Sequence, residues 1–135
     1  MKMNKKGFTI VELVIVIAVI AILAGVMIPT FGGVIDSANE SSAKQEAQGI
    51  YKQVIIADPT LNSTDTVLYI TVENDKYVFV VENAEIKLIK DEGDTQTAYT
   101  AYTSATTGES ATHEAKTTIN GTYEVPEGAK VYVKK

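Results

Sequence analysis

The first feature of the chain is one long apolar run. From Leu13 to Ile28 no residue is polar, and in the longer run from Phe8 to Ile28 only Thr9 and Glu12 interrupt it. At about 1.5 Å per residue, the longer run forms a helix of roughly 31 Å, which is enough to cross a hydrocarbon core of about 30 Å. The pattern therefore predicts a membrane-spanning helix.

Two ordinary kinds of segment share this pattern. A secretory signal peptide has the same basic start, but small residues should mark a cleavage site after its apolar core, and Ala24 with Ile22 two positions earlier is a poor match. A single-pass anchor also fits, with the leading lysines held in the cytoplasm. The anchor leaves Glu12 unexplained, because a carboxylate in the hydrocarbon region is costly and needs a partner or a role.

A cut between Gly7 and Phe8 would supply such a partner. The new α-amino group would be largely protonated near neutral pH, and it would lie four residues before Glu12 on the same face of the helix. The amine and the carboxylate could then pair within one chain or between neighbouring chains. The plainer alternative is that Glu12 complements the helix dipole in the first turn.

These residues resemble the class III signal of type IV pilins and pseudopilins. The shared features are a basic leader ending in glycine, a phenylalanine, a glutamate four residues later, an apolar helix and a proline near its end. The matching positions are Lys5, Lys6, Gly7, Phe8, Thr9, Glu12 and Pro29. The resemblance is close over about the first fifth of the chain and is architectural beyond it.

The resemblance implies a route of processing and assembly. A prepilin peptidase in the membrane would cleave after Gly7 and methylate the amine of Phe8, and Glu12 would pair with the Phe8 amine of an adjacent subunit. The implied partners are other copies of the chain, the prepilin peptidase, the pilus assembly machinery and, before assembly, membrane lipid.

The helical pattern continues beyond the apolar run with a different character. Pro29, Gly32 and Gly33 weaken the helix and predict a kink, and the resemblance to pilins suggests unwinding here when subunits pack. From Val34 to Ile56, apolar residues recur at three- and four-residue steps, and polar residues fill the other face. We expect a sheet to pack mainly against residues 43–56.

The rest of the chain shows strand patterns and turn signals. Asp58-Pro59 ends the helix, and residues 58–65 predict a connecting loop. Strands are predicted at 66–72 and 76–82, forming a hairpin, at 85–90 as a third antiparallel strand, and at 122–125 and 130–133 as a closing hairpin around Pro126-Glu127-Gly128. Residues 95–118 are rich in threonine, alanine and serine and predict a loop or a weak strand.

Together these elements predict an α+β fold of the pilin type. A long N-terminal helix would have an apolar half that protrudes and an amphipathic half that packs on a small antiparallel β-sheet. The expected segments are a cleaved basic leader at 1–7, an apolar membrane or filament-core helix at 8–29, its amphipathic continuation at 30–57, and a globular antiparallel β domain at 58–135 with the Thr/Ala-rich loop 95–118.

Composition narrows the possible functions. The chain has no cysteine, so no disulfide can stabilise the small domain, and its formal net charge of −5 disfavours electrostatic binding to nucleic acid. His113 is the only histidine and cannot form a zinc site of usual composition. We expect it in a solvated loop.

Acidic side chains give only weak candidates for a metal site. Asp91, Glu92 and Asp94 surround Gly93 and offer oxygen ligands for calcium, but their spacing matches no defined loop, and a solvated acidic turn is the favoured interpretation. The sequence shows no activated nucleophile and no phosphate-binding glycine loop. We therefore expect neither enzymatic activity nor a cofactor.

The sequence predicts a structural subunit. The precursor would be a single-pass protein of the cytoplasmic membrane with its globular domain outside, and the processed subunit would enter an extracellular pilus on the cell surface. The nearest alternative is a pseudopilin of a type II secretion or DNA-uptake machine. A further alternative is a membrane-anchored binding domain that does not assemble.

Overall fold

A computed structural model describes residues 6–90 and 97–135 of the chain. The chain divides into two compact units, one ending at Ala38 and one from Asn39 to Lys135. The first helix, α1, covers Ile10–Ala57. The elements that follow are η1 (Pro59–Leu61), β1 (Leu68–Val72), β2 (Tyr77–Glu82), β3 (Glu85–Lys90), α2 (Thr97–Thr106), β4 (His113–Lys116), β5 (Thr118–Ile119), β6 (Tyr123–Glu124) and β7 (Lys130–Lys134).

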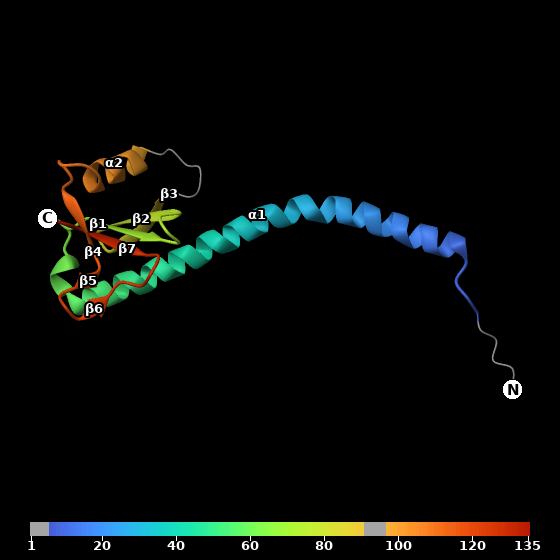
Figure 1. The fold of residues 1–135 in the computed structure, drawn as a ribbon, viewed down its shortest axis with the longest axis horizontal. Coiled ribbons are helices and arrows are strands. Elements are labelled where there is room, and N and C mark those ends of the chain that lie inside the picture. Colours follow the sequence, from blue (N-terminus) through green and yellow to red (C-terminus); the bar gives the residue numbers. More distant parts are fainter. Residues whose placement is uncertain (1–5, 91–96) are drawn as a thin grey trace, which may run out of the picture. The chain divides into compact units, whose positions relative to one another are not determined.

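The second unit is built on a five-stranded antiparallel sheet with strand order β3-β2-β1-β7-β4 (Figure 1). The last turns of α1 pack on one face of this sheet, and α2 packs on the other. Strands β5 and β6 form a separate two-stranded ladder. The predicted α+β class, with a long apolar N-terminal helix followed by a small antiparallel sheet, is confirmed.

The packing face of α1 follows its helical period. Ala43, Ala47, Ile50 and Val54 are buried, at steps of four, three and four residues, and all belong to the core cluster that contains β1 residues such as Ile70. Two alanines in this stripe let the helix approach the sheet closely. The prediction that the sheet packs mainly against residues 43–56 is confirmed.

Strands β1 and β2 carry nearly continuous apolar runs because both faces of the sheet are covered. In β1, Leu68 and Ile70 lie in the cluster that faces α1, while Tyr69 lies in the cluster beneath α2. Alternate residues of a strand point to opposite faces. A strand that is covered on both sides therefore needs apolar residues at successive positions.

The adjacent apolar pair at the end of β3 faces both sides of the sheet, next to a β-bulge. Phe79 is paired with Leu88 and Val78 with Lys90, so Ile89 is the extra residue between them. Leu88 packs with the cluster facing α1, and Ile89 is buried in the cluster beneath α2. The two neighbours thus serve opposite faces of the sheet.

The prediction of a loop or weak strand over residues 95–118 is wrong where the helix α2 forms, whereas the short strand β4 agrees with it. Tyr99, Tyr102 and Ala105 recur at three-residue steps on one side of α2 and pack on the sheet. Tyr102 meets the rings of Tyr69 and Tyr132 with centroids 5.3 and 5.7 Å away. The threonine-rich composition hides this apolar stripe in the sequence. Within the helix, threonine hydroxyls are satisfied by hydrogen bonds to carbonyls one turn earlier.

The predicted hairpin between residues 122–125 and 130–133 is also wrong. Strand β6 pairs with β5, and β7 lies between β1 and β4 in the main sheet. The β5–β6 turn has Asn120 and Gly121 at φ of 49° and 67°, as a type I′ hairpin turn requires. This Asn-Gly pair is the turn signal that the sequence reasoning overlooked.

His113 lies in a buried strand position and not in a solvated loop, so that prediction is corrected. Its side chain is 8% exposed. Nε2 lies 3.1 Å from the Val67 carbonyl oxygen, and Nδ1 lies 2.9 Å from the Thr112 hydroxyl. Burial lowers the pKa of His113, and the charge of Lys134 lowers it further, against the opposing effect of the Val67 hydrogen bond.

We expect Tyr102→Ala to reduce the free energy of unfolding by about 3 kcal/mol, the cost typical of truncating a buried aromatic residue. Urea denaturation of the full chain in detergent micelles, followed by tyrosine fluorescence, measures the change. Tyr99→Ala is the matched control, because Tyr99 is only half-buried and should cost less than half as much. Equal losses would contradict the role of Tyr102 as the anchor of α2.

Acidification should destabilise the fold through His113. Its folded-state pKa lies below the ordinary value of 6.5, so the unfolded chain binds more protons over this window, and stability falls as pH drops through 6.5. Asp75 and Glu114 stay ionised there, because their pKa values lie below 3.8 and 4.5. The urea midpoint should fall between pH 7.5 and 5, and His113→Gln should remove most of the pH dependence. If the urea midpoint of the His113→Gln variant still fell with pH as steeply as that of the unsubstituted chain, the pH dependence would belong to other groups.

Candidate functional site

Helix α1 begins with a reciprocal capping box between Thr9 and Glu12. The Thr9 backbone N–H and hydroxyl both donate to Oε2 of Glu12, at 2.8 and 2.9 Å, and the Glu12 N–H donates to the Thr9 hydroxyl at 3.2 Å. Leu13 N–H donates to the Thr9 carbonyl at 3.2 Å. The pattern Thr-x-x-Glu before an apolar run is a local signal for this arrangement, and the sequence reasoning matched Thr9 only through the family resemblance.

The capping box gives Glu12 a role in the first helical turn that differs from the interaction with the helix dipole expected from the sequence. Its pairing with a cleaved terminus stays a prediction. Both bonds to the carboxylate use Oε2, so the Oε1 atom is not needed to hold the cap. The carboxyl group is exposed and lies at the edge of an apolar groove lined by Phe8, Leu13, Ile15 and Val16.

Gly7 and Phe8 lie before the helix in an irregular, exposed segment. The Phe8 side chain is 93% exposed. A Cβ atom added to Gly7 would meet no other atom within 4 Å. The peptide bond between these residues is therefore sterically open, and the fold of the described residues does not itself require glycine at position 7.

The apolar half of α1 has no protein cover in the single chain. Its large hydrophobic side chains are exposed, from 49% at Val19 to 82% at Ile10. None of the most apolar stretch of the helix is buried, and α1 is long and apolar enough to cross a membrane. An apolar surface of this extent marks a site of contact with lipid or with protein.

Helix α1 is continuous through Pro29, Gly32 and Gly33. The Thr30 hydroxyl donates to the Met27 carbonyl at 2.7 Å, beside the position where Pro29 lacks a donor. The described helix thus shows no unwound stretch at these residues. A kink here, or unwinding when subunits pack, stays a prediction.

The weak calcium candidates Asp91, Glu92 and Asp94 lie outside the described residues. Within residues 6–90 and 97–135, no group of three or more histidine, aspartate or glutamate side chains is arranged to hold a metal ion. The described part of the chain therefore places its distinctive chemistry at the start of α1.

Comparison with known proteins points to the same segment. Residues 2–28 match the prokaryotic N-terminal methylation motif. The chain is 40% identical over 76 residues to prepilin peptidase-dependent protein A of Clostridium perfringens, covering 54% of each protein. It is 38% identical over 55 residues to the type IV narrow pilus major component PilA5 of Thermus thermophilus, covering 41% of this chain and 47% of the relative. The chain spans about half the length of the curated relatives it matches, and no solved structure matches it.

Proposed function

Because the chain is type IV pilin-like and carries the prokaryotic N-terminal methylation motif, we propose that it is a structural subunit of an extracellular helical filament. The precursor is held in the cytoplasmic membrane by α1, is cut after Gly7, and then assembles through the same helix. Its partners are other copies of the chain, a prepilin peptidase and the assembly machinery of the membrane.

The observation that carries this proposal is the fully exposed apolar half of α1. Lipid covers such a surface in the precursor, and the equivalent helices of neighbouring copies cover it after extraction from the membrane. A contact between different surfaces of identical subunits does not close on itself and generates a helical fibre. The same surface of α1 therefore contacts lipid in the precursor and neighbouring copies in the filament.

The open segment at Gly7 and Phe8 supports cleavage at this bond. A protease needs an extended, accessible peptide, and these residues precede the first hydrogen-bonded turn. Because the described fold imposes no need for glycine at position 7, recognition by the peptidase is a sufficient reason for glycine there. The relative in Clostridium perfringens is named for its dependence on such a peptidase.

Glu12 serves the two stages in different ways. In the precursor it accepts hydrogen bonds at the exposed start of the helix, where unpaired backbone donors would be costly near lipid. After cleavage, the Phe8 amine of an adjacent subunit supplies a positive charge for the same carboxylate. A buried ion pair of this kind contributes most clearly by specifying register.

The first prediction of this proposal concerns the N-terminus of the mature protein. Mass spectrometry of protein from the cell surface should find chains that begin at N-methylated Phe8. Gly7→Val should leave the precursor uncut, because a branched side chain obstructs the site, whereas Gly25→Ala, at another exposed glycine, should be processed. An intact Met1 on exported protein would instead establish the simple membrane anchor.

The second prediction separates the charge of Glu12 from its capping role. Glu12→Gln keeps a side chain that can complete the capping box but removes the charge, and filament yield in the sheared surface fraction should fall roughly tenfold or more, since breaking a buried ion pair is strongly destabilising. Thr9→Ala removes the capping hydroxyl and keeps the carboxylate, so filaments should form.

Equal loss of filaments in both variants would assign Glu12 to the start of the helix alone. In both variants the precursor should be present in the membrane and cut after Gly7, which immunoblotting verifies.

Electron microscopy of the unsubstituted chain separates a surface pilus from the short fibre of a pseudopilin.

A further inference from the structure

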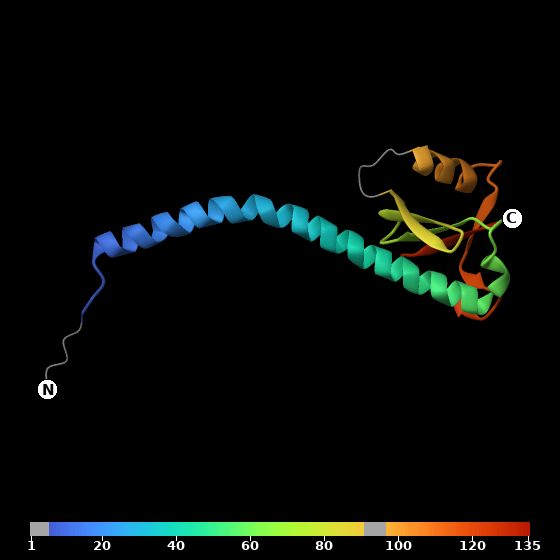
Figure 2. The same ribbon diagram turned by 180° about the vertical axis from the view of Figure 1, so that it is seen from behind.

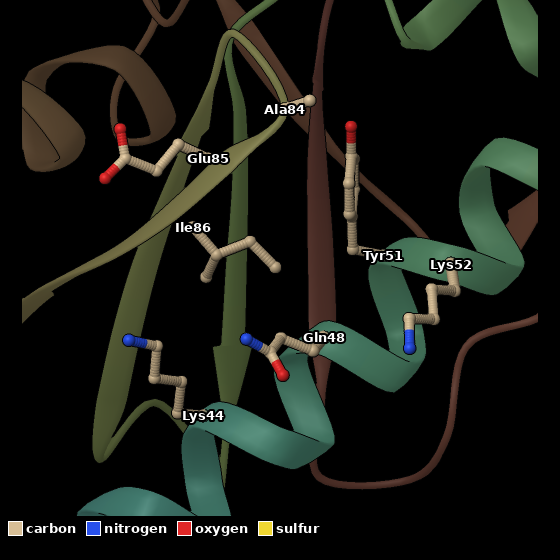
Figure 3. Close-up of a pocket in the computed structure, with 7 residues that line it drawn as sticks. All are labelled: Lys44, Gln48, Tyr51, Lys52, Ala84, Glu85 and Ile86. Carbon is tan, nitrogen blue, oxygen red and sulfur yellow. The ribbon is translucent and has the colours of Figure 1, made fainter.

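A groove runs between α1 and the edge strand β3, and it is called the α1–β3 groove below. Figure 3 shows Ile86 pointing into it and Glu85 pointing away. The residues that line it are Lys44, Gln48, Tyr51 and Lys52 of α1, with Ala84, Glu85 and Ile86 of the β2–β3 turn and β3. The groove therefore has an apolar floor and polar helix side chains along one wall.

The helix wall of the groove carries two exposed lysines. Lys44 and Lys52 are exposed and lie eight residues apart, which corresponds to about 12 Å along the helix axis. Neither makes an ion pair or hydrogen bond within the described part of the chain. Other lysines are engaged: Lys76, Lys87, Lys116 and Lys130 each pair with a carboxylate.

An acidic segment of similar length begins at the last residue of strand β6. Glu124 and Glu127 are exposed, and neither has an ion pair or hydrogen bond from its side chain among the described residues. Three extended residues span at most about 10 Å, close to the spacing of the two lysines. Pro126 lies between the carboxylates, exposed and apolar, and suits the floor at Ile86.

Backbone hydrogen bonds fix the conformation of this acidic segment. Val125 N–H donates to the Thr117 carbonyl at 2.9 Å, and Asn74 N–H donates to the Gly128 carbonyl at 2.8 Å. Gly128 has φ of 82°, a left-handed conformation that favours glycine. A segment already held in shape loses little conformational entropy when it binds.

The groove and the acidic segment lie on opposite sides of α1. In Figure 1 the connection from β6 to β7, drawn in red, passes in front of α1, whereas β3 lies above α1 and farther from the viewer; in Figure 2 β3 is on the near side and the connection on the far side. The two surfaces therefore cannot meet within one chain. Between two copies, a contact of these surfaces would be head-to-tail and could repeat along a filament.

We propose that the α1–β3 groove binds the Glu124–Glu127 segment of a neighbouring copy, with Lys44 and Lys52 pairing with its two carboxylates and Pro126 lying on Ile86. The inference rests on the proposed assembly of the chain into a filament. Removal of residues 1–7 takes away three lysines and no acidic residue. Such an acidic subunit needs specific opposite charges where copies touch.

Cysteine pairs test the contact directly, since the chain contains no cysteine of its own. The full chain with Gln48→Cys and Glu127→Cys is assembled, treated with a short bismaleimide, and analysed by denaturing electrophoresis. We expect a ladder of covalent multimers. The matched control, Gln53→Cys with Glu127→Cys, should stay monomeric, because Gln53 lies on a different face of α1, about 140° around the helix from Gln48.

The outcomes distinguish the two proposals. The groove contact alone would be overturned by one result: filaments form normally and their cysteines react with maleimide, but the crosslinked sample contains only monomeric subunits on the denaturing gel. Absence of filaments from the unsubstituted chain would reject the proposed function, and the groove contact with it.

Charge exchange provides a second test. Lys44→Glu with Lys52→Glu should lower filament yield about tenfold, the effect of losing two exposed ion pairs. Adding Glu124→Lys with Glu127→Lys should restore the yield. The control variant Lys134→Glu with Lys135→Glu changes the net charge equally. Its filament yield should be near that of the unsubstituted chain. Failure of the exchange to restore assembly would reject the Glu124–Glu127 segment as the occupant.

Discussion

The exposed apolar surface of α1 has to be kept from water, and most of the structure follows from that constraint. Between Ile10 and Ile28 the helix offers no charged side chain except Glu12, and backbone donors at its start need partners, which the Thr9–Glu12 capping box supplies. In the second unit the same helix changes character, because its buried stripe of Ala43, Ala47, Ile50 and Val54 is covered by the chain's own sheet.

The small domain gains stability by covering both faces of that sheet. Without cysteine it has no disulfide to limit the unfolded state, and below about a hundred residues a single core is thin. Helix α2 supplies a second apolar cluster through Tyr102, which meets Tyr69 and Tyr132.

Sequence reasoning succeeded where the signal is local and strong. The period of α1 and the strands β1 to β3 follow from spacing alone, and so does the burial of Ala47 and Ile50. It failed where tertiary contacts decide: α2 forms because Tyr102 finds a place on the sheet, and β7 joins β1 and β4, which are distant in sequence. His113 was misplaced for the same reason. The Thr9–Glu12 cap and the Asn120-Gly121 turn were local signals that a stricter search would have found.

The capping box has a consequence for the timing of assembly. While the leader is attached, the carboxylate of Glu12 already has its hydrogen bonds from Thr9, and the amine that would compete for it does not exist. In the proposed precursor, Glu12 would therefore find no α-amino group on a neighbouring copy to pair with. In the proposed route, cutting the bond after Gly7 would create that cation, so the rate of cutting would set how fast subunits become able to polymerise.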